Sequence, residues 1–258
     1  MPIATNYFAY KTAAERYAQD RPYFHPLIMD KIREQLAFER PVGDALDVGC
    51  GTGQSTVALR EIAGSVVGVD ASPDMLAVAQ AADGVRYLPS PAENIPLPDA
   101  GFDLVTVSLA FHWFDRPRFF AEVHRLLHPS GYLVIYNNAF RGEMRDDARF
   151  GEWLRRDFLM RYPTPARNNV PITQEEAQGY RFQLAHTENY TNEIVFSPEQ
   201  LVRYLLTQSN VIAAVEQGTE SVEDIYERLM GETAPLFVAQ TGAFSFGGYV
   251  WYLQKAAE

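Results

Sequence analysis

Short apolar runs alternate with helical patterns over the first half of the chain. Five runs have the length and composition of buried β-strands, at residues 45–48, 66–69, 85–88, 103–109 and 132–136. Between them, the apolar spacing predicts a helix over 54–63. Two more helices are predicted to begin at Ser72 and Asp115, where a capping side chain is soon followed by a proline. This alternation predicts right-handed βαβ units and a parallel sheet.

The pattern changes after Asn138. Residues 141–167 are charged and aromatic with no strand pattern, whereas 191–196 and 244–253 read as late strands. Ahead of the core, residues 12–40 predict two helices separated around two prolines. We therefore expect an α/β fold with a Rossmann-like, doubly wound, seven-stranded sheet. It should be mostly parallel with one antiparallel late strand, and carry N-terminal helices and an inserted helical lid.

The same pattern predicts a single domain over residues 1–258. Within it, residues 1–40 form a helical cap, 41–140 the cofactor-binding core and 141–190 the helical lid insertion. Residues 191–258 complete the sheet with strands and helices.

Composition excludes several function classes. Lys and Arg number 22 against 33 Asp and Glu, and this net charge of −11 argues against nucleic acid or anionic lipid as a partner. The lone Cys50 excludes a disulfide framework and a cysteine-rich metal site, so we expect a reducing cytoplasm and no metal. No apolar run is long enough to span a membrane, and the first eleven residues lack a signal pattern. The oligomeric state is not encoded in any of these features.

Candidate chemistry begins with a glycine-rich loop between the first strand and the first helix. Gly49, Gly51 and Gly53 alternate there, which is more than a tight strand–helix turn requires, so we expect a ligand at this loop. A dinucleotide fingerprint would need a further glycine where Gln54 stands. Asp70 ends the second strand, where an acid can accept both hydroxyls of any adenosine ribose.

Asp47 distinguishes between the possible cofactors. A carboxylate at the mouth of this loop would repel a pyrophosphate, but it complements a ligand that carries an ammonium and a sulfonium. S-adenosylmethionine carries both of these charges and no phosphate. The electrostatics therefore favour S-adenosylmethionine as the cofactor.

These residues also resemble a known family. The segments 45–53 (ALDVGCGTG) and 68–76 (GVDASPDML) are similar to the opening motifs of class I S-adenosylmethionine-dependent methyltransferases. The segments 92–97 and 102–105 resemble the third and fourth motifs of that family. Residues 128–133 resemble the turn before its fifth strand, with Ser130 where glycine is usual. Two other stretches, 14–26 and 111–115, resemble the subgroup of trans-aconitate methyltransferases.

The resemblance implies a role for each matching position. Asp47 and the backbone of Gly49, Cys50, Gly51 and Gly53 would face the methionine moiety, and Asp70 would bind the ribose hydroxyls. Adenine would contact Ala71 and Met75, together with the Ala92 backbone and Glu93. The carbonyl of Ser108 or Leu109 would accept from the ammonium, and Tyr17 and Arg21 would cover the carboxylate. Simpler readings stay open for Met75 as core filling, Glu93 as a solvated acid and Arg21 as a surface ion pair.

Methyl transfer depends mainly on positioning the acceptor, and it needs a base only if the acceptor arrives protonated. His112 follows the fourth strand at the edge where parallel sheets bind ligands, so it is the candidate catalytic base. The alternative is that His112 packs with Trp113 at the start of the next helix. Asn137 and Asn138 could orient the substrate or cap a turn.

The lid carries the one hint about substrate charge. Seven arginines lie within its first 27 residues, at positions 141, 145, 149, 155, 156, 161 and 167. They could attract an anionic small molecule, since arginine binds carboxylates through two hydrogen bonds. Alternatively, Glu152 with Arg156 and Asp157 with Arg161 are spaced as ordinary helical ion pairs.

We therefore expect a methyltransferase that acts on a small molecule, at the oxygen of a carboxylate or hydroxyl group. An NAD-dependent oxidoreductase is the alternative enzyme, and a non-catalytic S-adenosylmethionine-binding module is the alternative outside enzymes.

Overall fold

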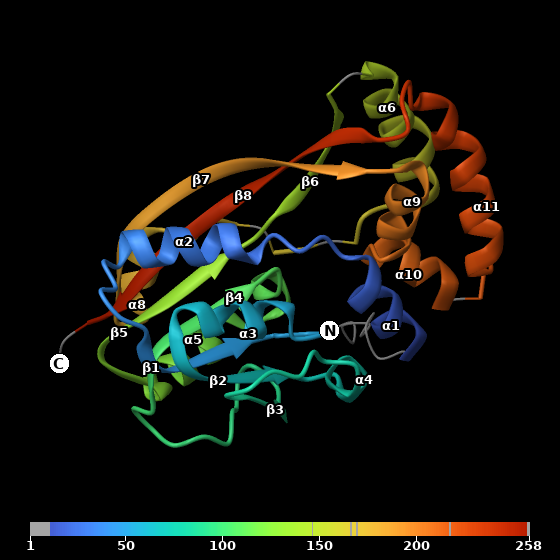
Figure 1. The fold of residues 1–258 in the computed structure, drawn as a ribbon. Helices are drawn as coiled ribbons and strands as arrows, with labels where there is room; N and C mark the ends of the chain where they lie inside the picture. The colour runs from blue at the N-terminus through green and yellow to red at the C-terminus, as the bar shows by residue number, and fades with distance from the viewer. Residues whose placement is uncertain (1–10, 146, 166, 169, 217, 257–258) are drawn as a thin grey trace. The chain divides into compact units, whose positions relative to one another are not determined.

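The computed structural model describes residues 11–256 except 146, 166, 169 and 217 (Figure 1). Its strands join in one eight-stranded sheet in the order β3-β2-β1-β4-β5-β8-β6, with β7 paired to β8. The strands are β1 Val42–Val48, β2 Ala63–Asp70, β3 Val85–Pro89, β4 Phe102–Ser108, β5 Leu127–Tyr136, β6 Ala139–Met144, β7 Phe182–Phe196 and β8 Gly242–Lys255.

The sheet topology confirms the predicted fold class. Strands β1 to β5 pair in parallel, and β8 pairs antiparallel to β5, as expected for the late strand. The strand order reverses direction between β1 and β4, which is the position where doubly wound sheets bind ligands at the carboxyl ends of their strands. Each of the seven predicted strands overlaps an observed one.

The eighth strand, β6, was not expected. The sequence predicts no strand over residues 141–167, because this stretch is charged and aromatic. In the structure Arg141 and Glu143 are exposed while Met144 is buried, and β6 is the last strand of the sheet order. Charged side chains are typical of a sheet edge, because they discourage pairing with another chain.

The helices begin where the capping signals predicted. The Ser72 side chain accepts from the Met75 N–H at 3.3 Å, and Asp115 accepts from the Arg118 N–H at 3.2 Å. The helices are α1 Lys11–Asp20, α2 His25–Gln35, α3 Gln54–Ala58, α4 Pro73–Ala77, α5 Arg116–Leu126, α6 Ala148–Trp153, α7 Leu159–Arg161, α8 Gln174–Gly179, α9 Pro198–Leu206, α10 Ser209–Glu216 and α11 Val222–Thr233. The helix expected over 54–63 is shorter, because a 3₁₀ turn at Leu59–Glu61 follows α3 and β2 starts at Ala63.

The chain divides into two compact units. The helical unit comprises the described residues of Met1–Pro22, Ala139–Ala166 and Tyr190–Gly248. The sheet unit comprises those of Tyr23–Asn138, Arg167–Asn189 and Tyr249–Glu258. Residues 167–189 of the predicted lid thus group with the sheet unit. Strands β7 and β8 each contribute residues to both units.

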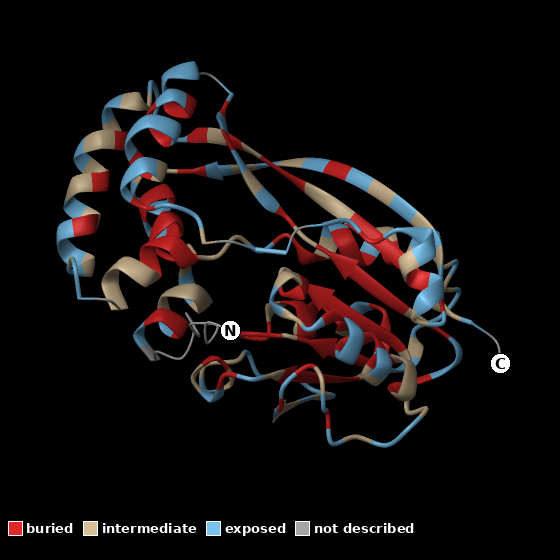
Figure 2. Cartoon of the chain, turned by 180° about the vertical axis from the view of Figure 1, so that it is seen from behind, coloured by how far each residue is buried: buried red, intermediate tan, exposed pale blue. Residues whose placement is uncertain are grey.

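Each unit has its own apolar core. In the sheet unit, the strands and helix α5 bury residues such as Leu46, Val105 and Phe120, and the central strands are largely red in Figure 2. In the helical unit, Phe150, Phe158 and Phe244 are fully buried in a second cluster. None of the helices described is both long and apolar enough to cross a bilayer.

Candidate functional site

The loop between β1 and α3 is built on three glycines in left-handed conformations. Gly49, Gly51 and Gly53 have φ angles of +71°, +54° and +81°. A Cβ at Gly49 would lie 2.5 Å from the Ala110 Cβ, and one at Gly53 would overlap the Tyr87 hydroxyl. Glycine is therefore required both for the backbone conformation and for close packing.

Asp70, at the end of β2, fixes this loop. Its Oδ2 accepts from the Gly51 N–H and its Oδ1 accepts from the Ser72 N–H, each at 2.8 Å. Burial raises the pKa of this carboxyl, and the two backbone hydrogen bonds oppose that shift. The residue is only partly buried, and a carboxylate has about four acceptor positions. Asp70 can therefore accept further hydrogen bonds from a ligand.

The surroundings of the Asp47 carboxylate differ from those expected. Its carboxylate is fully buried rather than at an open loop mouth, and it accepts from Ser55 Oγ at 2.6 Å, Thr56 Oγ1 at 2.7 Å and Thr106 Oγ1 at 3.1 Å. Burial raises its pKa, and these three hydroxyls oppose the shift. The hydroxyl partners were missed in the sequence. Thr106 offers the one signal, because it is a polar residue within an apolar strand, in register with Asp47.

Three further predicted cofactor contacts surround the loop. Met75 is buried, with its Cε 3.1 Å from the position of a Cβ on Gly51, so it packs against the loop. Ala71 is exposed immediately after Asp70. Cys50 is buried and burial raises its pKa, so its thiol is protonated at neutral pH and only its backbone is available to a ligand.

The end of β4 has an unusual backbone. Ser108 closes the strand with only 8% of its surface exposed, and Leu109 follows with a φ of +58°. The Leu109 N–H donates to the Tyr136 carbonyl of β5 at 3.0 Å. A non-glycine residue in this conformation is strained, and such strain is concentrated at functional sites.

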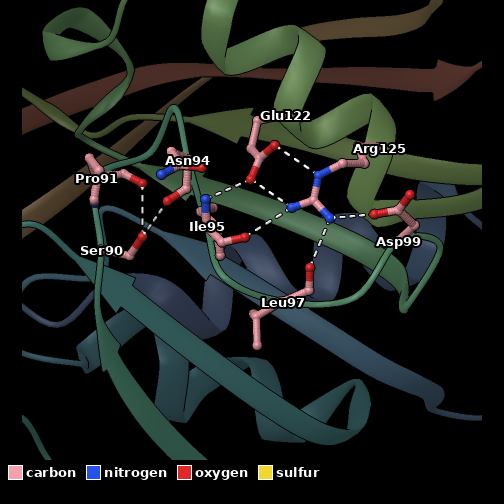
Figure 3. Close-up of polar contacts among 8 residues, drawn as sticks. All are labelled: Ser90, Pro91, Asn94, Ile95, Leu97, Asp99, Glu122 and Arg125. Carbon is pink, nitrogen blue, oxygen red and sulfur yellow. Dashed lines mark hydrogen bonds and ion pairs between the residues drawn. The ribbon is translucent and has the colours of Figure 1, made fainter.

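A polar network holds the loop at residues 90–100 against α5 (Figure 3). The Arg125 guanidinium donates to the carbonyls of Leu97 at 2.8 Å and Ile95 at 2.9 Å, and it also binds the carboxylates of Glu122 and Asp99. Glu122 Oε1 in turn accepts from the Ile95 N–H at 2.6 Å. Sequence reasoning did not identify this network, which immobilises the loop that carries Ala92 and Glu93.

Within that loop, Ala92 is buried in the apolar core. The Glu93 carboxylate accepts from the Asp115 N–H at 3.0 Å, so Glu93 is not merely a solvated acid. The second carboxylate oxygen of Glu93 has acceptor capacity left for a ligand.

His112 lies in a short 3₁₀ turn after β4. Its ring centroid is 4.5 Å from that of Trp113, so the packing expected as the alternative is present. Burial, together with the Arg167 charge, lowers the pKa of His112 to about 4. The imidazole is therefore neutral at pH 7 and can accept a proton.

Tyr17 and Arg21 belong to the helical unit, whereas the other predicted site residues belong to the sheet unit. The Arg21 guanidinium lies 4.7 Å from the Tyr17 ring centroid and 5.4 Å from that of Tyr204. Its Nη2 donates to the Thr207 carbonyl at 2.9 Å. Arg21 is thus held by aromatic rings and a carbonyl rather than by a surface acid.

The lid arginines are largely paired with acids. Arg156 binds Glu152 at 2.8 Å, as the helical spacing predicted, but Arg161 binds Glu232 at 3.1 Å in place of Asp157. The reason is a π-helical turn over Leu154–Phe158, which changes the spacing of side chains along the helix. Two more ion pairs join Arg145 with Glu193 and Arg149 with Asp147.

Comparison with known proteins gives a consistent result. The methyltransferase domain family matches residues 46–135. An uncharacterized methyltransferase of Mycobacterium bovis is 31% identical over 238 residues, which cover 91% of this chain and 90% of that protein. A Dictyostelium discoideum protein named as a methyltransferase is 36% identical over 124 residues, and this match spans about half of each chain, 48% and 46% respectively.

Solved structures share the fold. A protein from Anaeromyxobacter dehalogenans described as a type II methyltransferase superposes with a TM-score of 0.69 at 24% identity, covering 92% of this chain and 99% of that one. A Haemonchus contortus phosphoethanolamine N-methyltransferase, solved with S-adenosylhomocysteine, gives a TM-score of 0.53 at 18% identity, covering 96% and 58%. None of the relatives named here is a trans-aconitate methyltransferase, so that subgroup stays a prediction. The chain belongs to the class I S-adenosylmethionine-dependent methyltransferases.

Proposed function

We propose that this methyltransferase uses S-adenosylmethionine to methylate an oxygen atom of a small molecule, in a hydroxyl or carboxylate group. The observation that carries the cofactor assignment is the glycine loop held by Asp70, which leaves a carboxylate with spare acceptors beside three glycines. A malonyl-[acyl-carrier protein] O-methyltransferase of Serratia marcescens, 34% identical over 43% of this chain, supports oxygen as the acceptor atom.

The residues present fit this cofactor. Asp70 would accept the ribose hydroxyls, while Ala71, Met75, Ala92 and Glu93 would contact adenine. The backbone of the glycine loop, with Asp47 behind it, and the carbonyl of Ser108 or Leu109 would face the methionine end, which Tyr17 and Arg21 would cover. When bound, the sulfonium would supply a methyl group whose carbon–sulfur bond breaks, with its electron pair left on sulfur, as the acceptor oxygen forms the new bond.

The fate of the acceptor proton depends on the substrate. A carboxylate arrives without a proton, whereas a hydroxyl must lose one to solvent or to a base. His112 is neutral at pH 7 and lies just after β4, so we assign it as the proton acceptor for a hydroxyl substrate.

Calorimetric titration with S-adenosylhomocysteine tests the cofactor site. The wild-type protein should bind, and Asp70→Ala should weaken binding by about 1.5–3 kcal/mol, the value of hydrogen bonds to a charged group. Asp83→Ala is the control, since Asp83 is an exposed acid of the same unit. No binding by the wild type, or NADH binding in its place, would contradict the proposal.

Incubation with radiolabelled S-adenosylmethionine and a panel of carboxylic acids, phenols and amines tests the reaction. Label in an acid or a phenol supports methylation at oxygen. Label only in amines contradicts the choice of acceptor atom, and cofactor binding without any transfer favours a non-catalytic module.

A further inference from the structure

Two buried polar side chains at the carboxyl edge of the sheet lack hydrogen-bond partners within the described part of the chain. They are Ser108 at the end of β4 and Asn138, two residues after β5, which expose 8% and 7% of their surfaces. The Ser108 Oγ and Asn138 Oδ1 atoms have less than 1 Å² of accessible surface and no hydrogen-bond partner, so a ligand reaches them only when the groups that cover them move. A buried polar atom without a partner costs about 1–3 kcal/mol, so each such atom in a native protein calls for an explanation.

The two residues are neighbours in the sheet unit. Ser108 is in parallel register with Tyr136, and Asn138 follows Tyr136 by two residues. Leu109, whose backbone is strained, follows Ser108 in the chain. Its N–H donates to the carbonyl of Tyr136, two residues before Asn138. Unpaired oxygens and backbone strain therefore coincide at the edge where parallel sheets bind ligands.

The neighbouring Asn137 differs from Asn138 because its side-chain oxygen has a hydrogen-bond partner. Its Oδ1 accepts from the Tyr249 N–H of β8 at 3.0 Å, so its amide has a structural role in joining β5 to β8. Of the two asparagines that could orient a substrate, only Asn138 has a side-chain oxygen with no partner.

The chemistry of the two oxygens indicates what they bind. The Asn138 Oδ1 can only accept a hydrogen bond, whereas the Ser108 hydroxyl can donate or accept. A hydroxyl group satisfies both when it binds, because it donates its hydrogen to Asn138 and accepts from Ser108. When the oxygen is methylated, this hydrogen must leave Asn138 for His112 or for solvent, because an amide oxygen does not take up a proton. A carboxylate has no hydrogen to donate and would face the Asn138 oxygen with like partial charge.

We propose that Ser108 and Asn138 bind the methyl acceptor through a hydroxyl group, which selects an alcohol or phenol over a carboxylate. This inference rests on the proposed function and narrows its substrate class. It assigns to Ser108 Oγ a contact with the acceptor, in addition to the contact between its backbone carbonyl and the cofactor.

The first test needs no substrate. Urea unfolding of the cofactor-free Ser108→Ala and Asn138→Leu variants should give midpoints equal to or above that of the wild type, because each removes an unpaired buried oxygen. The matched Asn137→Leu variant should have a lower midpoint, since it breaks an existing hydrogen bond. A lower midpoint for Asn138→Leu as well would overturn the proposal and indicate a structural role, for instance through a bound water.

The second test uses the protein saturated with S-adenosylhomocysteine and titrated with phenol, catechol, benzyl alcohol and benzoate. Hydroxyl compounds should bind, and each variant should weaken this binding about threefold to tenfold, as expected for one hydrogen bond. Asn138→Leu should do so with unchanged S-adenosylhomocysteine affinity. Binding of benzoate alone, or of no hydroxyl compound, would overturn the proposal. The proposal would also be overturned if Asn138→Leu weakened cofactor binding as much as it weakened binding of the hydroxyl compounds. Its side chain would then be assigned to the cofactor. Failure of the wild type to bind S-adenosylhomocysteine would instead refute the proposed function itself.

Discussion

At the scale of single residues, side chains of one type differ sharply in state because their surroundings differ. Asp47 is fully buried under three hydroxyl donors, whereas Asp70 is partly exposed and bonds two backbone N–H groups. Both were predicted to contact the cofactor. Only Asp70 has the exposure that a direct contact with a ligand requires, so any influence of Asp47 on the proposed cofactor would be electrostatic, through the loop in front of it.

The backbone conformation of Ser130 was indicated by the sequence. It stands where the family usually has glycine, and it adopts a φ of +62° at an exposed position of β5, where the register with β4 shifts. A left-handed conformation costs a non-glycine residue about 1–2 kcal/mol, and glycine returns part of this through its greater entropy in the unfolded chain. Ser130→Gly should therefore raise the free energy of unfolding by about 0.5–1 kcal/mol in urea melts.

The control for this substitution is Ala121→Gly, at an exposed position in the interior of helix α5. It should lower the free energy of unfolding by about 1 kcal/mol, because glycine is a poor helix former. A loss of stability in Ser130→Gly would show that the serine side chain makes a contribution of its own.

The pH dependence of activity follows from His112. Its pKa is lowered to about 4, so the neutral base persists well below the usual pKa of 6.5. With a hydroxyl acceptor, kcat should be insensitive to His112 ionisation at neutral pH and fall as the pH approaches 4. His112→Gln should lower kcat about 10²-fold at pH 7, the low end of the range for a general base, because the lowered pKa makes the imidazole a weaker base.

The measurement is transfer of radiolabelled methyl groups across pH, with S-adenosylhomocysteine affinity as the control. The same lowered pKa means that the unfolded chain binds this proton more tightly. Stability from His112 is thus present above pH 6.5 and lost as the pH falls towards 4. An unchanged kcat in the variant would leave His112 with its packing role beside Trp113.

At the scale of elements, the loop of residues 90–100 depends on helix α5 for its shape. Arg125 reaches two of its carbonyls, and Glu122 accepts one of its N–H groups. The loop has no regular secondary structure of its own to hold Ala92 and Glu93 in place. These two side chains of α5 therefore determine where the predicted adenine contacts lie.

Arg125→Ala should weaken S-adenosylhomocysteine binding about tenfold. The loop would lose hydrogen bonds that hold it in one conformation, and ordering it on binding would then cost about as much as one to two hydrogen bonds. Amide hydrogen exchange at residues 92–99 should become faster at the same time. Arg118→Ala, at an exposed arginine of the same helix, is the matched control and should change neither quantity. Faster exchange with unchanged affinity would place the network outside the binding function.

At the scale of the whole molecule, ligand binding and stability are linked. A ligand that binds only the folded state at a concentration 100 times its Kd adds about 2.7 kcal/mol to the free energy of unfolding. S-adenosylhomocysteine should therefore raise the Tm of the wild type, and NAD should not. The Asp70→Ala variant should show a smaller rise at the same ligand concentration, as measured by scanning calorimetry.

Much of this protein could be predicted from local patterns. Alternating strands and helices, the left-handed glycines and the caps at Ser72 and Asp115 depend on residues close together in the chain, and the structure confirms them. The conformations allowed to glycine and the hydrogen bonds of a helix start are local properties. That is why the fold class and the position of the glycine loop could be predicted from the sequence.

Other features were decided only by the tertiary structure. The enclosure of Asp47 by Thr106, the edge strand β6, the partner of Arg161 and the unpaired oxygens of Ser108 and Asn138 all depend on residues far apart in sequence. Burial and hydrogen-bond pairing at such positions are set by which segments meet in space, and no short-range pattern records that.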